Sequence, residues 1–391
     1  MRFVLLKGLS QYGSLRLHVD QLAQALIEAG HEAVIADMAA DDRQQQLNAA
    51  LQPAPHCLFG FSGVGADLRG EAGTIYDVLG VVYASIYVDH PVHHIARIQT
   101  PIRRNVCFFL DRSHIPFVNA IGAGANFSQL GFLPPGANAL PEPPDLSDET
   151  FARRDIPLMF TGTYRGAPSA YWREWPEGAS KVLAESLVAR MTADARLPLL
   201  DGLRATLRDV GAELSRDLLV ALMPQLTLAQ SYAEAYHRDA LIHRLGQAGL
   251  PLHLWGAGWE GLAERYPSFV YGGVGSFAET LHTLRCARVV LNINNGFVAG
   301  GHERVFTAMC AGAAVFSDAN RYYEEAFKEG REIVTFPWPK LANAPDLLGD
   351  LVEDQARAAG VARAGTRRAM AEHRWSDRAQ RLVKAVKASL P

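Results

Sequence analysis

The stretch Asn292–Asp318 constrains the fold more than any other part of the sequence. The apolar run 288–293 predicts a strand buried on both faces, the glycine-rich run 296–301 predicts a turn, and a helical pattern starts at Glu303. Gly312 ends that helix, and another apolar strand follows it. The succession of strand, glycine loop, helix and strand is typical of a parallel α/β sheet.

The glycine loop and the start of this helix predict an anion-binding site. Gly300 and Gly301 let a ligand approach the backbone closely, and the first helical turn offers unpaired N–H groups and the positive end of the helix dipole. His302, Glu303 and Arg304 follow directly, so one guanidinium belongs to the helix start. The alternative for Arg304 is a surface arginine or one paired with a glutamate.

Two asparagines, Asn294 and Asn295, end the strand before the glycine loop. Their amides can bind the hydroxyl groups of a ligand, or they can cap the turn. Asn294 is therefore a candidate binding residue.

Length and composition limit the classes of protein to consider. With 391 residues, about half of them apolar, the chain suits two domains of ordinary size. Its 38 basic and 41 acidic residues nearly balance, which argues against a nucleic-acid partner. No apolar run approaches the ~20 residues of a membrane span, and the N-terminus does not resemble a signal peptide. The four cysteines form no CxxC pair. We expect buried thiols and a soluble cytoplasmic protein.

The first 140 residues predict a doubly wound α/β domain. A strand at 3–7, a turn from Gly8 to Gly13, an amphipathic helix and a second strand open it, and further strands follow. The turn lies at the carboxyl end of a strand, where open parallel sheets bind ligands, so Gly13 is a candidate binding residue. The turn reads GxxxxG rather than GxGxxG and does not predict a dinucleotide.

The second half predicts another α/β domain with an insert. The stretch from Leu133 to Glu149 is rich in proline, acidic and small residues, as linkers are. The residues from about 178 to 249 are helical in pattern and predict two to four inserted helices. The expected fold is two Rossmann-like, doubly wound domains facing each other across a cleft. The predicted parts are a first domain at 1–140, a linker at 141–155, a second domain at 156–375 and a C-terminal helix at 376–391.

Several motifs, in this order along the chain, resemble glycosyltransferases of the GT-B fold. They are HVDQLAQALIEAGHEAVI, YVDHPVHH, FFLDRSHIPFV, LPPGAN, WGAGW, VYGGVG and ERVFTAMCAGAAVFSD. The resemblance is to the group related to the CgeB spore-maturation proteins and to the group 1, glycogen-synthase-like enzymes, and it covers most of the chain apart from the insert. It implies that the second domain holds a nucleotide-sugar donor and the first holds an acceptor, which is a protein, a glycan or a lipid-linked intermediate.

The last of these motifs departs from the family pattern at one position. The family usually places a glutamate just before an Ala-Met pair, where its side chain holds the ribose of the donor, and here that position is Thr307. The acidic partner that group 1 enzymes place seven positions earlier is replaced by Ala299 or Gly300. Glu303 or a backbone group is then left to make the ribose contact, with Thr307 beside it.

Transfer of a sugar from a nucleotide needs positive charge on the leaving diphosphate. Arg304 is one candidate, and Arg165, shortly after Thr163 at the end of a strand, is a second. No DxD-type metal motif lies in a suitable loop, so we expect metal-independent chemistry without a cofactor other than the donor.

The sequence offers four candidates for a base that activates the acceptor hydroxyl. His18 matches the histidine of the HV..LA pattern, and packing on a helix face is its alternative. Asp89 and His90 end a strand, where they can form a base and the group that orients it, or lie in a solvated loop. Asp111, beside Arg112, more simply forms a structural ion pair.

The histidines His90, His93 and His94 also permit a zinc interpretation. Pro91 interferes with a helical presentation of these side chains, and no HExxH or cysteine pattern supports a metal site. We expect no metal ligands.

Two strand ends of the second domain predict a wall beside the nucleotide base. A tryptophan in a strand more often belongs to the core, so the glycines carry this prediction. The candidate residues are Trp255, Gly256, Gly258, Tyr271 and Gly273.

Two alternatives to a transferase stay open. Thr307 in the place of the family glutamate favours a GT-B-shaped binding or assembly protein without activity, with the helical insert as its interaction surface. A sugar-nucleotide epimerase shares the fold as well. The sequence also leaves a homo-oligomer open.

Overall fold

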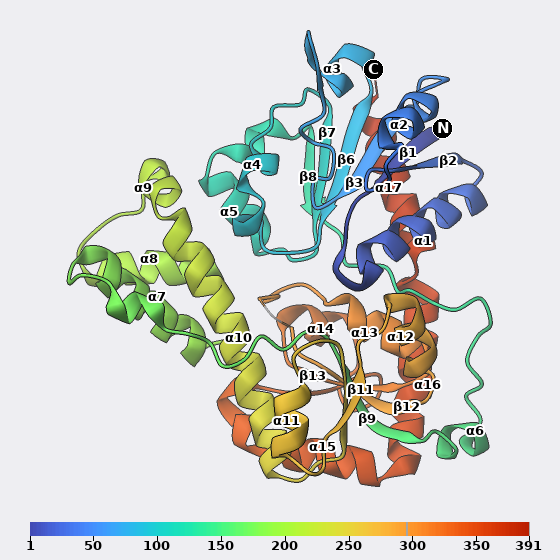
Figure 1. The fold of residues 1–391 in the computed structure, drawn as a ribbon, viewed down its shortest axis with the longest axis vertical. Coiled ribbons are helices and arrows are strands. Elements are labelled where there is room, and N and C mark those ends of the chain that lie inside the picture. The colour runs from blue at the N-terminus through green and yellow to red at the C-terminus, as the bar shows by residue number, and fades with distance from the viewer. Residues whose placement is uncertain (295, 391) are drawn as a thin grey trace. The chain divides into compact units, whose positions relative to one another are not determined.

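The computed structural model describes residues 1–294 and 296–390 and divides the chain into two compact units (Figure 1). The first unit comprises Met1–Asn138 together with Glu372–Pro391, and the second comprises Ala139–Ala371. The C-terminal helix α17, Trp375–Ser389, therefore belongs to the first unit.

The first unit contains a six-stranded sheet in which every neighbouring pair is parallel. Each residue of its central strands is buried, because helices cover both faces of such a sheet. The strand order is β2-β1-β3-β6-β7-β8, with β1 at Arg2–Lys7, β2 at Glu32–Asp37, β3 at Cys57–Phe61, β6 at Val82–Tyr87, β7 at Asn105–Phe109 and β8 at Gln129–Phe132. A short hairpin joins β4, Arg69–Gly70, to β5, Gly73–Thr74. The helices are α1 at Ser14–Glu28, α2 at Arg43–Ala50, α3 at Ile75–Leu79, α4 at Ile95–Ile98, α5 at His114–Ala120 and α17.

The helix α17 is tied into this unit by side-chain and backbone contacts. It packs against α1 and buries Leu382 and Val386 completely. The backbone N–H of Ala137 donates to the carbonyl of His373 at 2.7 Å, and the Arg378 guanidinium donates to the Pro134 and Pro135 carbonyls. The first unit therefore extends to Asn138, and the second begins at Ala139.

The second unit contains another six-stranded parallel sheet. Its order, β11-β10-β9-β12-β13-β14, is the 3-2-1-4-5-6 order of dinucleotide-binding folds, so the direction of the winding reverses between β9 and β12. The strands are β9 at Ile156–Thr161, β10 at Leu252–Trp255, β11 at Val270–Gly273, β12 at Ala287–Asn292, β13 at Ala314–Asp318 and β14 at Val334–Phe336.

Helices surround this sheet and form the insert. Those outside the insert are α6 at Asp148–Ala152, α11 at Glu260–Arg265, α12 at Phe277–Leu284, α13 at Glu303–Cys310, α14 at Arg321–Ala326, α15 at Ala344–Glu353 and α16 at Gln355–Glu372. The insert has four helices, in agreement with the prediction: α7 at Ala179–Ala193, α8 at Leu199–Asp209, α9 at Arg216–Ala221 and α10 at Met223–Gln247.

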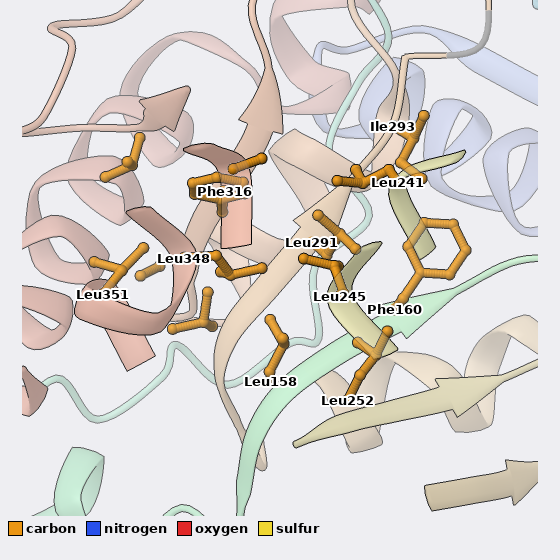
Figure 2. Close-up of a cluster of buried hydrophobic side chains, with 14 of the residues drawn as sticks. Leu158, Phe160, Leu241, Leu245, Leu252, Leu291, Ile293, Phe316, Leu348 and Leu351 are labelled. Carbon is orange, nitrogen blue, oxygen red and sulfur yellow. The ribbon is translucent and has the colours of Figure 1, made fainter. Parts of the chain in front are cut away.

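The core of the second unit lies around β9 and β12 and receives one end of α10 (Figure 2). Leu158 and Leu291 of the strands meet Leu241 and Leu245 of this helix, and none of the four is exposed to solvent. With 25 residues, α10 is about 37 Å long, so its N-terminal half extends beyond the core to α7, α8 and α9 (Figure 1).

Both doubly wound parallel sheets confirm the predicted fold class. Three of the four cysteines, Cys57, Cys107 and Cys310, are buried thiols. Within residues 1–294 and 296–390, no helix combines the length and the apolar character that crossing a membrane would require.

Candidate functional site

The carboxyl ends of β9 and β12 are joined by a single buried arginine. Arg304 of α13 donates from Nε to Thr161 Oγ1 at 3.2 Å and from Nη1 to Asn292 Oδ1 at 2.8 Å. Its guanidinium lies 4.7 Å from the centre of the Phe160 ring. Burial lowers the pKa of Arg304 to about 10, which leaves it a cation at neutral pH. A fixed positive charge therefore occupies the point at which the winding of the sheet reverses, where open α/β sheets bind ligands.

The start of α13 differs from the prediction of unpaired N–H groups. The side chain of His302 caps the helix and accepts from the Arg304 N–H at 3.1 Å. The N–H of His302 itself donates to the Tyr323 hydroxyl at 3.0 Å. The prediction is wrong for these two N–H groups because side chains of the protein already pair with them. Arg304 contributes through its side chain instead.

A buried polar network holds the strand end before the glycine loop. Asp318 accepts from both the backbone N–H and the side-chain amide of Asn294, at 2.9 and 2.8 Å, and from Trp338 Nε1 at 3.0 Å. Asn292 donates to Asn294 Oδ1 at 3.1 Å. The Tyr323 hydroxyl donates to the same oxygen at 2.7 Å. Burial raises the pKa of Asp318 to about 6, against the hydrogen bonds that lower it. Asn294 is thus a member of the network, whereas Asn295 lies outside the described residues.

The glycine loop is fixed by side chains from the following helix. Asn320 donates to the Gly300 carbonyl at 2.7 Å and caps α14 with its side-chain oxygen. A Cβ on Gly301 would lie 2.8 Å from the Phe306 ring, so this glycine is required for close packing. Gly300 and Gly301 are therefore packed against residues of α13 and α14.

A second arginine, Arg238, lies near Arg304, and a third, Arg165, lies near Arg238. Arg238 of α10 donates from Nη1 to the carbonyl of Thr163 at 2.5 Å. Burial lowers the pKa of Arg238, and the charge of Arg165 lowers it further, while the charge of Arg238 contributes to the lowered pKa of Arg304. Arg165 is exposed in the loop after β9. We name Arg165, Arg238 and Arg304 the arginine cluster.

Sequence analysis missed Arg238 because it lies in the insert. It is 73 residues after Arg165 and 66 before Arg304 in the chain, and on a long helix an arginine normally indicates a solvated face. The only signal available was its place four residues after Glu234 and eight after Gln230, a spacing that puts all three side chains on one stripe of the helix.

Glu303 and Thr307 contact each other one turn apart on α13. Thr307 Oγ1 donates to Glu303 Oε2 at 3.2 Å. Burial raises the pKa of Glu303 to about 7, while the charge of Arg304 and the Thr307 hydrogen bond act in the opposite direction. A carboxyl group therefore lies against the position at which the family pattern has its glutamate, and it is supplied from the preceding turn.

The loops after β9, β10 and β11 are joined edge to edge. Gly162 N–H donates to the Trp255 carbonyl, and Gly256 N–H donates to the Gly273 carbonyl, both at 2.9 Å. A Cβ on Gly256 would lie 2.2 Å from the Gly162 carbonyl oxygen, so this glycine is required by the close approach of two loops.

The remaining residues of this predicted wall have structural partners. Gly258 approaches the Tyr164 carbonyl as closely as Gly256 approaches Gly162. Trp255 is half-buried, and its ring packs on Gly272. Tyr271 hydrogen bonds to Glu260 and lowers the pKa of that carboxyl, together with the backbone around Glu260. Their role beside a nucleotide base stays a prediction.

In the first unit, His18 lies inside the core. Its Nδ1 is 3.1 Å from Asn138 Oδ1, and its ring packs between Phe61 and Trp375 with centroid distances of 5.8 and 5.3 Å. Burial lowers its pKa to about 4, so the imidazole is neutral at pH 7. Gly13, just before the same helix, has φ = 75° and allows the chain to turn into α1.

Asp89 and His90 do not form the predicted pair of base and orienting group. Asp89 is exposed, and its Oδ2 lies 3.4 Å from His94 Nε2. The ring of His90 is buried against His114 and Phe117, and its Nδ1 accepts from the Val92 N–H at 3.1 Å. Pro91 follows and turns the chain, so the Asp89 side chain is exposed whereas the His90 ring is buried.

The other two first-unit hypotheses concern Asp111 and a zinc site. The Asp111 carboxylate accepts from the Ser113 N–H at 2.6 Å and is fully buried. Among the residues that the structure describes, no group of three or more His, Cys, Asp or Glu side chains is arranged to hold a metal ion.

Comparison with known proteins identifies the fold. Residues 238–384 match a family model described as glycosyl transferase-like. The chain is 11% identical to an alpha-glucosyltransferase solved with UDP, with a TM-score of 0.58 over 99% of this chain and 100% of the other. It is 10% identical to HepE of Anabaena in complex with UDP-glucose, with a TM-score of 0.54 over 99% and 100% of the two chains.

A third solved structure is AviGT4, a glycosyltransferase involved in avilamycin A biosynthesis. It is 16% identical, with a TM-score of 0.50 over 100% of this chain and 98% of the other. No curated protein matches the chain. The similarities cover both units and confirm the predicted GT-B fold.

The raised pKa of Asp318 predicts a specific dependence of stability on pH. The carboxyl ionises near pH 3.8 in the unfolded chain but only near pH 6 in the folded one. The folded state therefore binds the extra proton between these values, and the contribution of Asp318 to stability falls by up to about 3 kcal/mol as the pH rises from 4 to 6. Urea unfolding at several pH values should show this fall in the wild type and not in Asp318→Asn. The control is Asp350→Asn, an exposed aspartate on α15. If the difference in free energy of unfolding between the wild type and Asp318→Asn does not change with pH, the raised pKa of Asp318 is contradicted.

Proposed function

We propose that this chain of GT-B fold is a glycosyltransferase that transfers a sugar from a nucleoside diphosphate sugar, held by the second unit, to an acceptor hydroxyl. The observation that carries this proposal is the arginine cluster at the carboxyl end of β9. Guanidinium groups bind phosphate oxygens through paired, charge-assisted hydrogen bonds. Three of them at this edge supply the positive charge that a departing diphosphate needs.

The nucleotide is most simply uridine diphosphate. Solved proteins of the same fold were captured with UDP or UDP-glucose, which makes these the first ligands to test on this chain. The base would lie against the joined loops after β10 and β11, where Trp255 and Tyr271 are half-buried. The glycines of these loops, Gly256, Gly258 and Gly273, leave the backbone open to a planar ring.

The ribose contact falls to Glu303. Its carboxyl is half-buried on α13, next to Arg304, and Thr307 holds one of its oxygens. A carboxylate accepts hydrogen bonds from two vicinal hydroxyls, which is the chemistry that a ribose presents. Thr307 thereby serves as a positioning residue for a carboxylate that comes from one turn earlier in the helix.

The acceptor would bind to the first unit. A protein, a glycan or a lipid-linked intermediate supplies the hydroxyl group. Of the candidate bases, Asp89 has an exposed carboxylate after the end of β6, whereas the rings of His18 and His90 are buried and neutral and Asp111 is fully buried. Asp89 is therefore the residue that we assign as base, with His94 beside it.

One observation favours a second candidate, a binding or assembly protein without transferase activity. Thr307 cannot accept ribose hydroxyls as a carboxylate does. Such a protein would bind no nucleotide sugar and release no UDP. An epimerase would instead release a free, altered sugar without an acceptor, so product analysis with and without acceptor separates the three.

The arginine cluster predicts that Arg238→Gln weakens the binding of UDP by about 10- to 100-fold, because one charge-assisted hydrogen bond contributes about 1.5–3 kcal/mol. Isothermal titration calorimetry with UDP measures this loss. Arg244→Gln, an exposed arginine on the same helix, is the matched control and should bind as the wild type does. If the Arg238→Gln variant and the wild type bind UDP with equal affinity, the diphosphate does not bind at Arg238.

The raised pKa of Glu303 predicts that donor binding depends on pH. Because its carboxyl ionises near pH 7, the acceptor of ribose hydroxyls is mostly protonated at pH 6 and mostly ionised at pH 8. The affinity for UDP should rise by up to about tenfold between these values. In Glu303→Gln this rise should be absent. If the affinity for UDP instead falls as the pH rises from 6 to 8, Glu303 lies beside the phosphates rather than the ribose.

The same arginines predict transfer that does not require a divalent metal, because they supply the charge that stabilises the leaving group. Release of UDP from the donor should proceed at the same rate with EDTA and with added Mg²⁺ or Mn²⁺. A loss of more than tenfold in EDTA, restored by either metal, would contradict metal independence.

A further inference from the structure

The long helix α10 passes from the core of the second unit to the carboxyl edge of its sheet and beyond. Leu241 and Leu245, near its C-terminal end, pack on the strands. Arg238 lies beside Thr163, two residues after β9 ends. Residues that precede Arg238 in the helix therefore lie farther out from the sheet.

A polar stripe on this helix continues outward from Arg238. Gln230, Glu234 and Arg238 are four residues apart, so their side chains lie on one face at intervals of about 6 Å along the helix axis. Gln230 Nε2 donates to Glu234 Oε1 at 2.8 Å. Gln230 is 2% exposed, so this amide holds the carboxylate from within the protein.

The outer part of the stripe contacts the glycine loop. A Cβ on Gly296 would lie 2.2 Å from Gln230 Nε2 and 2.8 Å from Glu234 Oε1. Gly296 also has φ = 77°, a conformation that favours glycine. The loop that precedes α13 is thus shaped to receive these two side chains from the insert.

We propose that Glu234, held by Gln230, binds hydroxyl groups of the transferred sugar and selects the donor. This assignment rests on the proposed function, since it takes the diphosphate to lie at the arginine cluster. Glu234 is one helical turn from Arg238, and a pyranose ring linked to the outer phosphate spans a similar distance. An ionised carboxylate accepts hydrogen bonds from two neighbouring hydroxyls, which fits a hexose with free hydroxyl groups.

The charges around Glu234 agree with a position next to the arginine cluster. Its negative charge acts on Arg238 and opposes the effect of burial on that guanidinium, so the two groups lie in one electrostatic environment. Gln230 touches the same loop and fixes one carboxylate oxygen, which makes it a positioning residue.

The test compares the binding of UDP with that of UDP-sugars. Calorimetry on the full chain uses UDP, UDP-glucose, UDP-galactose and UDP-N-acetylglucosamine. For the sugar that the wild type binds best, we expect Glu234→Gln to reduce affinity by at least tenfold, while the affinity for UDP alone changes less than twofold. Glu234→Asp keeps the charge but withdraws it by one methylene, and it should show the same selective loss. Glu185→Gln, an exposed glutamate of the insert on α7, should leave all affinities unchanged.

Two results would overturn the assignment. One is an unchanged preference for the sugar in both Glu234 variants when their thermal unfolding matches that of the wild type. The other is an equal loss for UDP and for UDP-sugar, because it would mean that Glu234 acts on the diphosphate or on the loop. Failure of the wild type to bind any of the four ligands would instead overturn the proposed function.

Discussion

The buried contact between Arg304 and Asn292 is the interaction on which the site of the second unit depends. It joins the start of α13 to the end of β12, and through Thr161 it reaches β9 as well. A buried cation is costly unless polar groups surround it, and here two strand ends and the face of Phe160 do so. The Asp318 network holds Asn294, just after the same strand, through its backbone N–H and its side-chain amide.

Much of the fold could be predicted from the sequence because buried parallel strands have a simple signature. The run Cys57–Phe61 has no polar side chain, and Ala314–Asp318 is apolar up to Phe316 and is followed by a turn and the helix α14. The same pattern placed the predicted anion site at the loop before α13, and that loop precedes the buried Arg304. The geometry of this loop was not predictable, because a histidine is an unusual cap for a helix. The His302 side chain accepts from the Arg304 N–H, so Arg304 contributes through its side chain rather than through its backbone.

The contribution of the insert could not be predicted either. Arg238, Glu234 and Gln230 lie on a helix whose polar residues resemble a solvated face, and only contacts with Thr163 and Gly296 distinguish them. His18 shows the opposite case: its pattern indicates chemistry, but Phe61 and Trp375 enclose its ring. A sequence specifies which side chains are available, whereas distant packing decides which of them reach a ligand.

The membership of α17 in the first unit has a consequence for how the chain folds. The second unit is continuous from Ala139 to Ala371, but the first lacks Trp375, Leu382 and Val386 until α17 has also been synthesised. Domains usually complete their cores in order from the N-terminus, and here the second core can be complete before the first. Until α17 is made, α1 has an uncovered apolar face, so the newly made first unit depends on α17 to cover it.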